Sequence, residues 1–419
     1  MSAPRKKAAR GGTAPAERRG APRPLAAHVA AAASDLQHGV ALAVAAADER
    51  FPWRPSLRPL AEEIAQGFAA HDPSAVRAAV AETALSDALS ALDGMAAYQA
   101  APPLRRPAEP PAVWRAGAAR LLDYGGETED APALLVLPSL VNGPWILDIS
   151  RARSFLRGLR RRGLRPLLLD WGDPSREERN FDLGAYVERR AAPALERAAA
   201  LTGQPRIGLL GHCMSGALAA ATAARRPERV ERFALMAAPW RFAPLRPPEG
   251  AQPRRRELQQ LIEACGAVFG GVPSDILNTL FFLRDPLQAT RKFPQFAKKG
   301  RNSDVGRRFV AIEDWLGHGP RLAAPAAKTL FLDWGLDDAL YHGRWIAEGA
   351  LFQPRAAAAP ALVIASASDT VAPYDSVAAA ADALPNARLL KPGGGHVGML
   401  VGRGAEAALW DPVAAFFRD

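Results

Sequence analysis

Short apolar runs and longer amphipathic stretches alternate through most of this chain. The runs at 131–141 and 164–171 are almost wholly apolar and end at turn residues, which is typical of strands buried on both faces of a sheet. This alternation predicts an α/β fold with a mostly parallel, doubly wound sheet. The expected strands are 131–141, 164–171, 207–212, 232–238, 361–369 and 387–392, with an edge strand at 113–125; the expected helices are 149–162, 183–201, 376–383 and 405–417.

The pattern changes on both sides of this core. Residues 35–100 carry apolar residues at three- and four-residue steps and predict helices, with Asp72 or Ser74 as an N-cap. The segment 102–111 is a proline-rich connector, and 241–350 is mainly helical and is interpreted as an inserted cap. The expected organisation is a disordered basic tail (1–34), a helical region with its connector (35–111), a first part of the core (112–240), the helical cap (241–350) and a second part of the core (351–419).

The net charge of +10 is concentrated at the N-terminus. Residues 1–25 alone carry a net +6, so the rest of the 419 residues is only mildly basic. A like-charged block without periodicity predicts a solvated tail, and binding to nucleic acid is not expected. The weakly apolar stretch after the basic residues, interrupted by His28, does not resemble the core of a signal peptide.

The cysteine content predicts a cytoplasmic setting. The only cysteines are Cys213 and Cys265, so a disulfide framework is excluded as an organising principle and a reducing compartment is expected. No apolar run reaches the roughly 18 residues needed to span a bilayer, so no transmembrane segment is predicted.

Cys213 occupies the position of a nucleophile. The apolar run 207–212 leads into the cysteine, and small residues and a helix-length alanine-rich run follow, which is the strand–turn–helix context of a nucleophile elbow. The N-terminus of a helix stabilises a thiolate and an oxyanion. The usual pattern is G-x-[S/C]-x-G, whereas Ser215 stands here at the last position and Gly216 comes one residue later. A small buried hydrophobic residue is the alternative interpretation of this cysteine.

A cysteine nucleophile needs a base and an orienting carboxylate. Asp369 ends the apolar run 361–369, and His396 follows the strand at 387–392 in a glycine-rich loop. Loops at the C-terminal ends of parallel strands carry functional side chains, and the order Cys213, Asp369, His396 is that of an α/β-hydrolase triad. As alternatives, Asp369 caps the helix that follows and His396 bonds to the backbone. His212 is expected to be a packing or polar-gate residue.

The oxyanion hole is expected to use backbone amides on both sides of the cysteine. Met214 follows Cys213 directly, and Val141 or Asn142 supplies the second donor from the loop after the strand ending near Leu137. No histidine has metal-ligand spacing and no phosphate-binding glycine motif is present, so neither a metal nor a cofactor is predicted.

Several of these segments resemble the polyhydroxyalkanoate synthase family and its hydrolase-like relatives. The resemblance implies an α/β-hydrolase fold and polymerisation of 3-hydroxyacyl-CoA at a polyester granule surface, with Cys213 as the acyl-carrying nucleophile, His396 as the base and Asp369 as its carboxylate. It also suggests homodimers that form through the cap. The segments are LPSLVNGPWILDIS, LRPLLLDWGDP, FDLGAYV, LLGHCMSGALA, LMAAPWRF, FFLRDPLQATRKF, ALVIASASDTVAPYDS and GGGHVG.

Two positions depart from the family pattern. Its elbows usually read G-x-C-x-G-G, where this chain has Ser215, and its aspartate is commonly followed by His, where this chain has Thr370. Three functions therefore stay open: a synthase-like acyltransferase, a cysteine-dependent esterase, thioesterase or depolymerase-like hydrolase, and a non-catalytic granule-associated protein.

Overall fold

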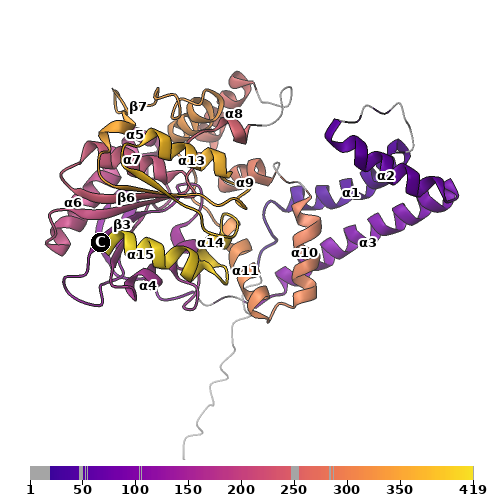
Figure 1. The fold of residues 1–419 in the computed structure, drawn as a ribbon, viewed down its shortest axis with the longest axis horizontal. Helices are drawn as coiled ribbons and strands as arrows, with labels where there is room; N and C mark the ends of the chain where they lie inside the picture. The colour runs from indigo at the N-terminus through magenta and orange to yellow at the C-terminus, as the bar shows by residue number, and fades with distance from the viewer. Residues whose placement is uncertain are drawn as a thin grey trace, which may run out of the picture. The chain divides into compact units, whose positions relative to one another are not determined.

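The computed structural model describes residues 19–418, apart from 47–50, 52, 54, 103, 105, 247–253, 283, 284 and 286. The chain forms two compact units, drawn in Figure 1. The smaller unit comprises Met1–Leu104 and Pro286–Val310, and the larger comprises Arg105–Asp285 and Ala311–Asp419. The basic side chains of the predicted tail up to residue 18 lie outside the described residues.

The smaller unit is built from four helices: α1 (Leu25–Ala46), α2 (Arg58–Ala69), α3 (Pro73–Gln99) and α10 (Gln288–Lys299). The predicted N-cap Asp72 is confirmed, because its carboxylate accepts hydrogen bonds from the amides of Ser74 and Ala75 at 3.0 and 2.9 Å. Helices α3 and α10 pack tightly at Gly94, where a Cβ atom would lie 2.3 Å from the carbonyl oxygen of Phe293.

Two predictions for these segments were wrong. The prediction of a disordered tail to residue 34 fails over 25–34, because the alanine-rich sequence favours helix and Ala31 and Ala32 are buried within the unit. The prediction that 241–350 forms a single cap fails over 286–310, because this part belongs to the smaller unit. Helical periodicity marks an apolar face but does not say which helix covers it.

The larger unit is organised by an eight-stranded sheet in the order β1-β2-β4-β3-β5-β6-β9-β10. Strands β4, β3, β5, β6, β9 and β10 pair in parallel, and β1 and β2 form an antiparallel hairpin at one edge, where the sequence had predicted one strand over 113–125. The turn falls at Gly117, whose positive φ of 57° suits glycine. The strands are β1 (Ala112–Ala116), β2 (Ala119–Asp123), β3 (Ala133–Leu137), β4 (Arg165–Asp170), β5 (Ile207–His212), β6 (Val230–Met236), β9 (Ala361–Ile364) and β10 (Ala387–Leu390).

Helices cover both faces of the sheet, as predicted. Figure 1 shows α4 and α15 on one face and α7 and α13 on the other. The core strands β3 and β5 are buried along their whole length, which explains why their sequences are apolar up to His212 at the end of β5. The helices are α4 (Phe155–Arg160), α5 (Leu183–Tyr186), α6 (Ala192–Thr202), α7 (Ser215–Arg225), α13 (Tyr374–Ala383), α14 (Gly398–Val401) and α15 (Asp411–Arg418).

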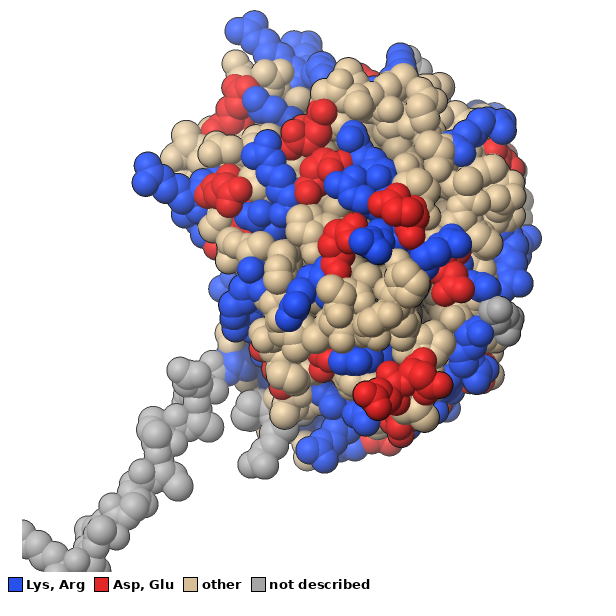
Figure 2. Space-filling view, turned by 90° about the vertical axis from the view of Figure 1, so that its left-hand side faces the viewer, with Lys and Arg blue, Asp and Glu red and all other residues tan. Residues whose placement is uncertain are grey.

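The insertion between β6 and β9 is mainly helical. It contains α8 (Arg255–Phe269), α9 (Ser274–Phe282), the end of α11 (Asp304–Leu316) and α12 (Ala324–Lys328), followed by the small hairpin of β7 (Ile346–Ala347) and β8 (Ala350–Leu351). In the part of the chain that the structure describes, no helix combines the length and apolar character needed to cross a bilayer. On the face shown in Figure 2, basic and acidic side chains are interspersed.

The close approach of α3 and α10 can be tested with two glycines of the smaller unit. Gly94→Ala should lower the free energy of unfolding by about 1–3 kcal/mol, because its new methyl group meets the backbone of α10. Gly67→Ala is the matched control, since nothing lies within 4 Å of its Cβ position. It should raise the free energy of unfolding by about 0.5–1 kcal/mol. Urea denaturation followed by circular dichroism measures both, and equal effects would contradict the packing.

Candidate active site

The backbone turns sharply at Cys213, between β5 and α7. Its φ of +56° lies in the left-handed region, which non-glycine residues rarely adopt, and its amide donates to the carbonyl of Met236 at 2.8 Å. Strand and helix approach so closely that a Cβ at Gly211 would lie 2.2 Å from the carbonyl oxygen of Ser215. A Cβ atom at Gly216 would lie 2.3 Å from the Cβ atom of Ala238. The turn therefore has the strained geometry of a nucleophile elbow and leaves the Cys213 side chain partly exposed.

Asp369 and His396 are joined directly. The His396 Nδ1–H donates to Asp369 Oδ2 at 2.8 Å, and the Asp369 side chain is fully buried. The other carboxylate oxygen of Asp369 accepts from the amides of Val371 and Ala372 at 2.8 and 2.9 Å. Asp369 therefore stabilises its own loop and orients the imidazole. It does not cap α13 (Tyr374–Ala383), whose N-cap residue Pro373 has no side-chain hydrogen bond, so the alternative interpretation of Asp369 as a helix cap was wrong. Thr370, the second departure from the family pattern, is exposed.

A second contact ties the two loops that carry these residues. The Ser366 hydroxyl donates to the carbonyl of Gly394, two residues before the histidine. Gly394 has a φ of +90°, and a Cβ there would lie 2.9 Å from the carbonyl carbon of Gly398, so the loop requires glycine at this position. The glycine-rich sequence thus lets the loop turn back beneath His396.

The electrostatics of His396 favour its charged form. Burial by itself lowers the pKa of this imidazole, but hydrogen bonds to Asp369 and Cys213 and the charges of both groups raise it to about 10. The imidazole thus interacts with the carboxylate and with the sulfur. A protonated imidazole beside a cysteine stabilises a thiolate, which is the nucleophilic form.

His212 packs against this pair without joining it. Its ring lies 5.7 Å from the ring of His396, centroid to centroid, and is buried. Burial, together with the charge of His396, lowers the pKa of His212 to about 3, so its imidazole is neutral at physiological pH. Neither ring nitrogen has a hydrogen-bond partner among the described residues. The predicted packing role fits these contacts.

The loop after β3 lies directly against the elbow. In the parallel pairing of β3 with β5, Leu137 stands beside Gly211, so both strands end at the same level. The next carbonyl, that of Pro138, accepts two hydrogen bonds: one from the Ser215 hydroxyl at 2.6 Å and one from the Trp171 indole at 2.8 Å. The Ser215 side chain, which replaces the usual glycine, therefore attaches the elbow to the loop expected to complete the oxyanion hole.

The three expected oxyanion donors lie around this contact. Met214 and Asn142 have no acceptor for their amides among the described residues, and the Asn142 side-chain nitrogen is also unpartnered. The amide of Val141 donates to the Ser139 hydroxyl at 3.2 Å, a long bond. Asn142 is therefore the better second donor of the two.

Sequence reasoning missed the residues that hold this loop. Trp171 anchors Pro138, and the Trp315 indole donates to the carbonyl of Gly143 at 2.7 Å from the other side. An indole that stands far from the elbow in the sequence gives no local signal of such a role. Within the described ranges, no group of three or more His, Cys, Asp or Glu residues is arranged to hold a metal ion.

Comparison with known proteins agrees with this geometry. Residues 132–402 match the family described as the alpha/beta hydrolase fold. The chain belongs to that family. This confirms the predicted fold class, and the matched segment runs from β3 past His396, so it contains the whole elbow–loop assembly.

Among curated hydrolase-fold relatives, the chain is similar to poly(3-hydroxyalkanoate) polymerase subunits PhaC, as its motifs predicted. It is 29% identical to that of Haloferax mediterranei over 73% of this chain and 63% of that protein. It is 24% identical to that of Allochromatium vinosum, over 70% of this chain and 82% of that protein. The chain therefore spans less than two thirds of the length of the Haloferax protein.

Solved hydrolase-fold structures are also similar. The enol-lactonase from Burkholderia xenovorans aligns with a TM-score of 0.47 and 17% identity, over 72% of this chain and 97% of that one. The monoacylglycerol lipase from Paleococcus ferrophilus aligns with a TM-score of 0.46 and 15% identity, over 71% of this chain and 98% of that one.

The Ser215 contact can be measured through stability. Ser215→Ala removes a fully buried hydroxyl that donates to Pro138, so the free energy of unfolding should fall by about 1 kcal/mol. Ser376→Ala is the matched control, because that serine is equally buried but its hydroxyl has no partner among the described residues. Its replacement should leave stability unchanged or raise it. If urea denaturation gives the same loss for both variants, the Ser215 bond contributes nothing.

The Asp369–His396 pair predicts how stability depends on pH. A Cys213→Ser background removes the titrating thiol. Because the Asp369 carboxylate still raises the folded pKa of His396 above the ordinary value of 6.5, the pair's stabilisation should be complete below pH 6.5 and be lost as the pH rises through the folded pKa. That pKa lies lower than in the unsubstituted protein, because the contribution of Cys213 is gone. The slope is at most about 1.4 kcal/mol per pH unit. Adding Asp369→Asn removes the main cause of the raised pKa and should abolish this slope in urea titrations.

Asp148→Asn in the same background is the control for this measurement. Asp148 is also buried, but its cationic partner is Arg157, at 3.0 Å, and a guanidinium does not titrate in this range. The variant should lose stability at every pH and keep the slope. A slope that survives Asp369→Asn would show that His396 is not held in its charged form by Asp369.

Proposed function

We propose that this protein is a polyhydroxyalkanoate synthase-like acyltransferase that forms a Cys213-linked acyl-enzyme from 3-hydroxyacyl-CoA and extends a polyester. The observation that carries the proposal is the Cys213 elbow, with the Asp369–His396 pair interacting with its sulfur. The similarity to poly(3-hydroxyalkanoate) polymerase subunits supports the substrate class. The similarity to these polymerase subunits also supports the prediction that the chain is an enzyme.

In the first step His396 takes the proton of the Cys213 thiol, and the thiolate attacks the thioester carbonyl. The amides of Met214 and Asn142 stabilise the tetrahedral oxyanion. The carbon–sulfur bond to CoA then breaks, and the CoA thiolate leaves with the proton from His396. The acyl group is now a thioester of Cys213. Exchange of one thioester for another is nearly isoenergetic, which suits a cysteine carrier.

In the second step His396 takes the proton of the hydroxyl group of another hydroxyacyl unit. The alkoxide attacks the acyl-cysteine carbonyl, an ester bond forms and the Cys213 thiolate is released. Neither step needs a metal or a further cofactor. Water in place of the hydroxyl would make the same site a hydrolase. A product that stays attached would keep the protein at the surface of a polyester granule in the cytoplasm.

Incubation of the purified protein with 3-hydroxybutyryl-CoA tests the proposal. We expect release of CoA, formation of polymer and an acyl adduct on Cys213 in the mass spectrum of the intact protein. Cys213→Ala should abolish all three. Cys265→Ala is the matched control, because Cys265 is buried in α8 and its burial raises the pKa of its thiol, so activity should persist.

The other outcomes assign different functions. Release of CoA with free 3-hydroxybutyrate and no polymer would make the protein a thioesterase. Absence of turnover and of any adduct would leave a non-catalytic granule-associated protein. Full activity of Cys213→Ala would overturn the mechanism itself.

A further inference from the structure

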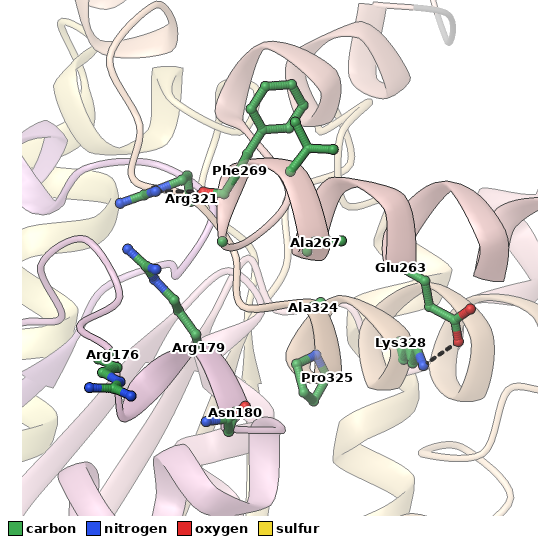
Figure 3. A pocket seen from close by; sticks show the side chains of 13 residues that line it. Arg176, Arg179, Asn180, Glu263, Ala267, Phe269, Arg321, Ala324, Pro325 and Lys328 are labelled. Carbon is green, nitrogen blue, oxygen red and sulfur yellow. Dashed lines mark hydrogen bonds and ion pairs between the residues drawn. The ribbon is translucent and has the colours of Figure 1, made fainter.

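A cavity of about 660 Å³ lies in the larger unit, between the segment after β4, the end of α8 and α12 (Figure 3). Four cationic side chains line it against one acidic side chain, Glu263. The other lining residues are small, apolar or amide-bearing. The cations are Arg176, Arg179, Arg321 and Lys328.

Two of these cations form ion pairs and two do not, although the charge of Arg179 also acts on Asp173, the carboxylate that pairs with Arg321. Arg321 forms an ion pair with Asp173, and Lys328 contacts Glu263 at 2.7 Å. The guanidinium groups of Arg176 and Arg179 form no ion pair with any carboxylate in the described part of the chain. The cavity thus has an excess of positive charge in planar groups that bind phosphate oxygens in pairs.

An aromatic side chain stands at the same cavity. Val268 and Phe269 at the end of α8 are 72% and 49% exposed, although both are large and apolar. Figure 3 shows Arg179 pointing toward this end of α8, and a Cβ at Gly270 would lie 2.8 Å from its Nε atom. Figure 3 shows the Phe269 ring projecting from the end of α8, away from Arg176 and Arg179. An exposed ring at the rim of a cavity that also holds arginines without carboxylate partners suits a phosphorylated ligand that carries an aromatic base.

The cavity opens at the same edge of the sheet as Cys213. Arg176 and Arg179 follow β4, Cys213 follows β5, and only β3 separates these two parallel strands. With neighbouring strands about 4.8 Å apart, β4 and β5 are separated by about 10 Å.

Arg321, which lines the cavity, belongs to a segment that also packs against the loop after β3. The segment 315–321 begins at Trp315, which holds Gly143, and ends at Arg321 in the cavity. Between them, a Cβ at Gly319 would lie 2.6 Å from the carbonyl oxygen of Val141, so the segment packs against that loop.

We propose that this cavity binds the phosphorylated adenosine end of a CoA thioester whose acyl end lies at Cys213. The inference rests on the proposed function for its substrate. Arg176 and Arg179 bind the phosphate groups, Phe269 stacks on the adenine, and the pantetheine arm extends along the segment 315–321 to the elbow.

Calorimetric titration of the full chain with adenosine 3′,5′-bisphosphate tests the site without catalysis. The double variant Arg176→Ala/Arg179→Ala should bind about tenfold more weakly or worse, because it loses two charge-assisted contacts. Arg161→Ala is the matched control: this exposed arginine precedes β4, at the opposite end of that strand, and should bind like the wild type. No binding by the wild type, or equal binding by the double variant, would overturn the proposal.

Phe269→Ala tests the contact with the adenine base separately from the contacts with the phosphate groups. It should weaken binding of adenosine 3′,5′-bisphosphate and leave binding of inorganic pyrophosphate unchanged. If both ligands are equally affected, or neither is, the assignment of Phe269 to the base is wrong.

Kinetics with two thioesters distinguish this inference from the proposed function. The double variant should raise the KM for 3-hydroxybutyryl-CoA about tenfold or more at unchanged kcat, with no effect on the N-acetylcysteamine thioester, which lacks phosphates. If the wild type binds the bisphosphate but turns over neither thioester, the proposed function fails and the cavity assignment stands. If it turns over the CoA thioester and the double variant has the same KM, the cavity assignment fails and the function stands.

Discussion

The geometry of the site depends on the close approach of β5 and α7 around Cys213. The chain can make this turn only with the cysteine at positive φ and with no side chain at Gly211 or Gly216. The strain is balanced by the surrounding structure, since the Cys213 amide bonds to β6 and Ser215 bonds to the loop after β3. Three parallel strands thereby hold the sulfur in one orientation at the edge of the sheet.

The loop after β3, Asp369 and His396 are also positioned by the ends of parallel strands. Each follows a different parallel strand, and hydrogen bonds between the loops fix their relative positions. Asp369 orients His396, and a second hydroxyl contact joins the loops that carry them. The carbonyl of Pro138 accepts from Ser215 and from Trp171, so hydrogen bonds join the elbow, the loop after β3 and the end of β4. Ser215 stands where the elbow motif usually has glycine, and its side chain makes a structural contact.

Much of this architecture was predictable from local patterns. The strands were recognised because parallel strands buried on both faces must be apolar. The elbow was recognised because a tight strand–helix turn requires small residues. The errors came from segments whose structure depends on their neighbours. These are the helix over 25–34, the hairpin of β1 and β2, and helix α10, which belongs to the smaller unit rather than to the cap.

The sequence by itself therefore determined the fold class, the position of Cys213 at a tight strand–helix turn, and the places of Asp369 and His396 in loops after strands, because these follow from burial and turn chemistry within short segments. Only the tertiary structure decided which distant side chains meet. Trp171 holds Pro138, and Arg179 shares a cavity with the end of α8, because of the strand order and the path of the cap. Contacts between segments far apart in the chain leave no periodicity in the sequence, so no local pattern could have predicted them.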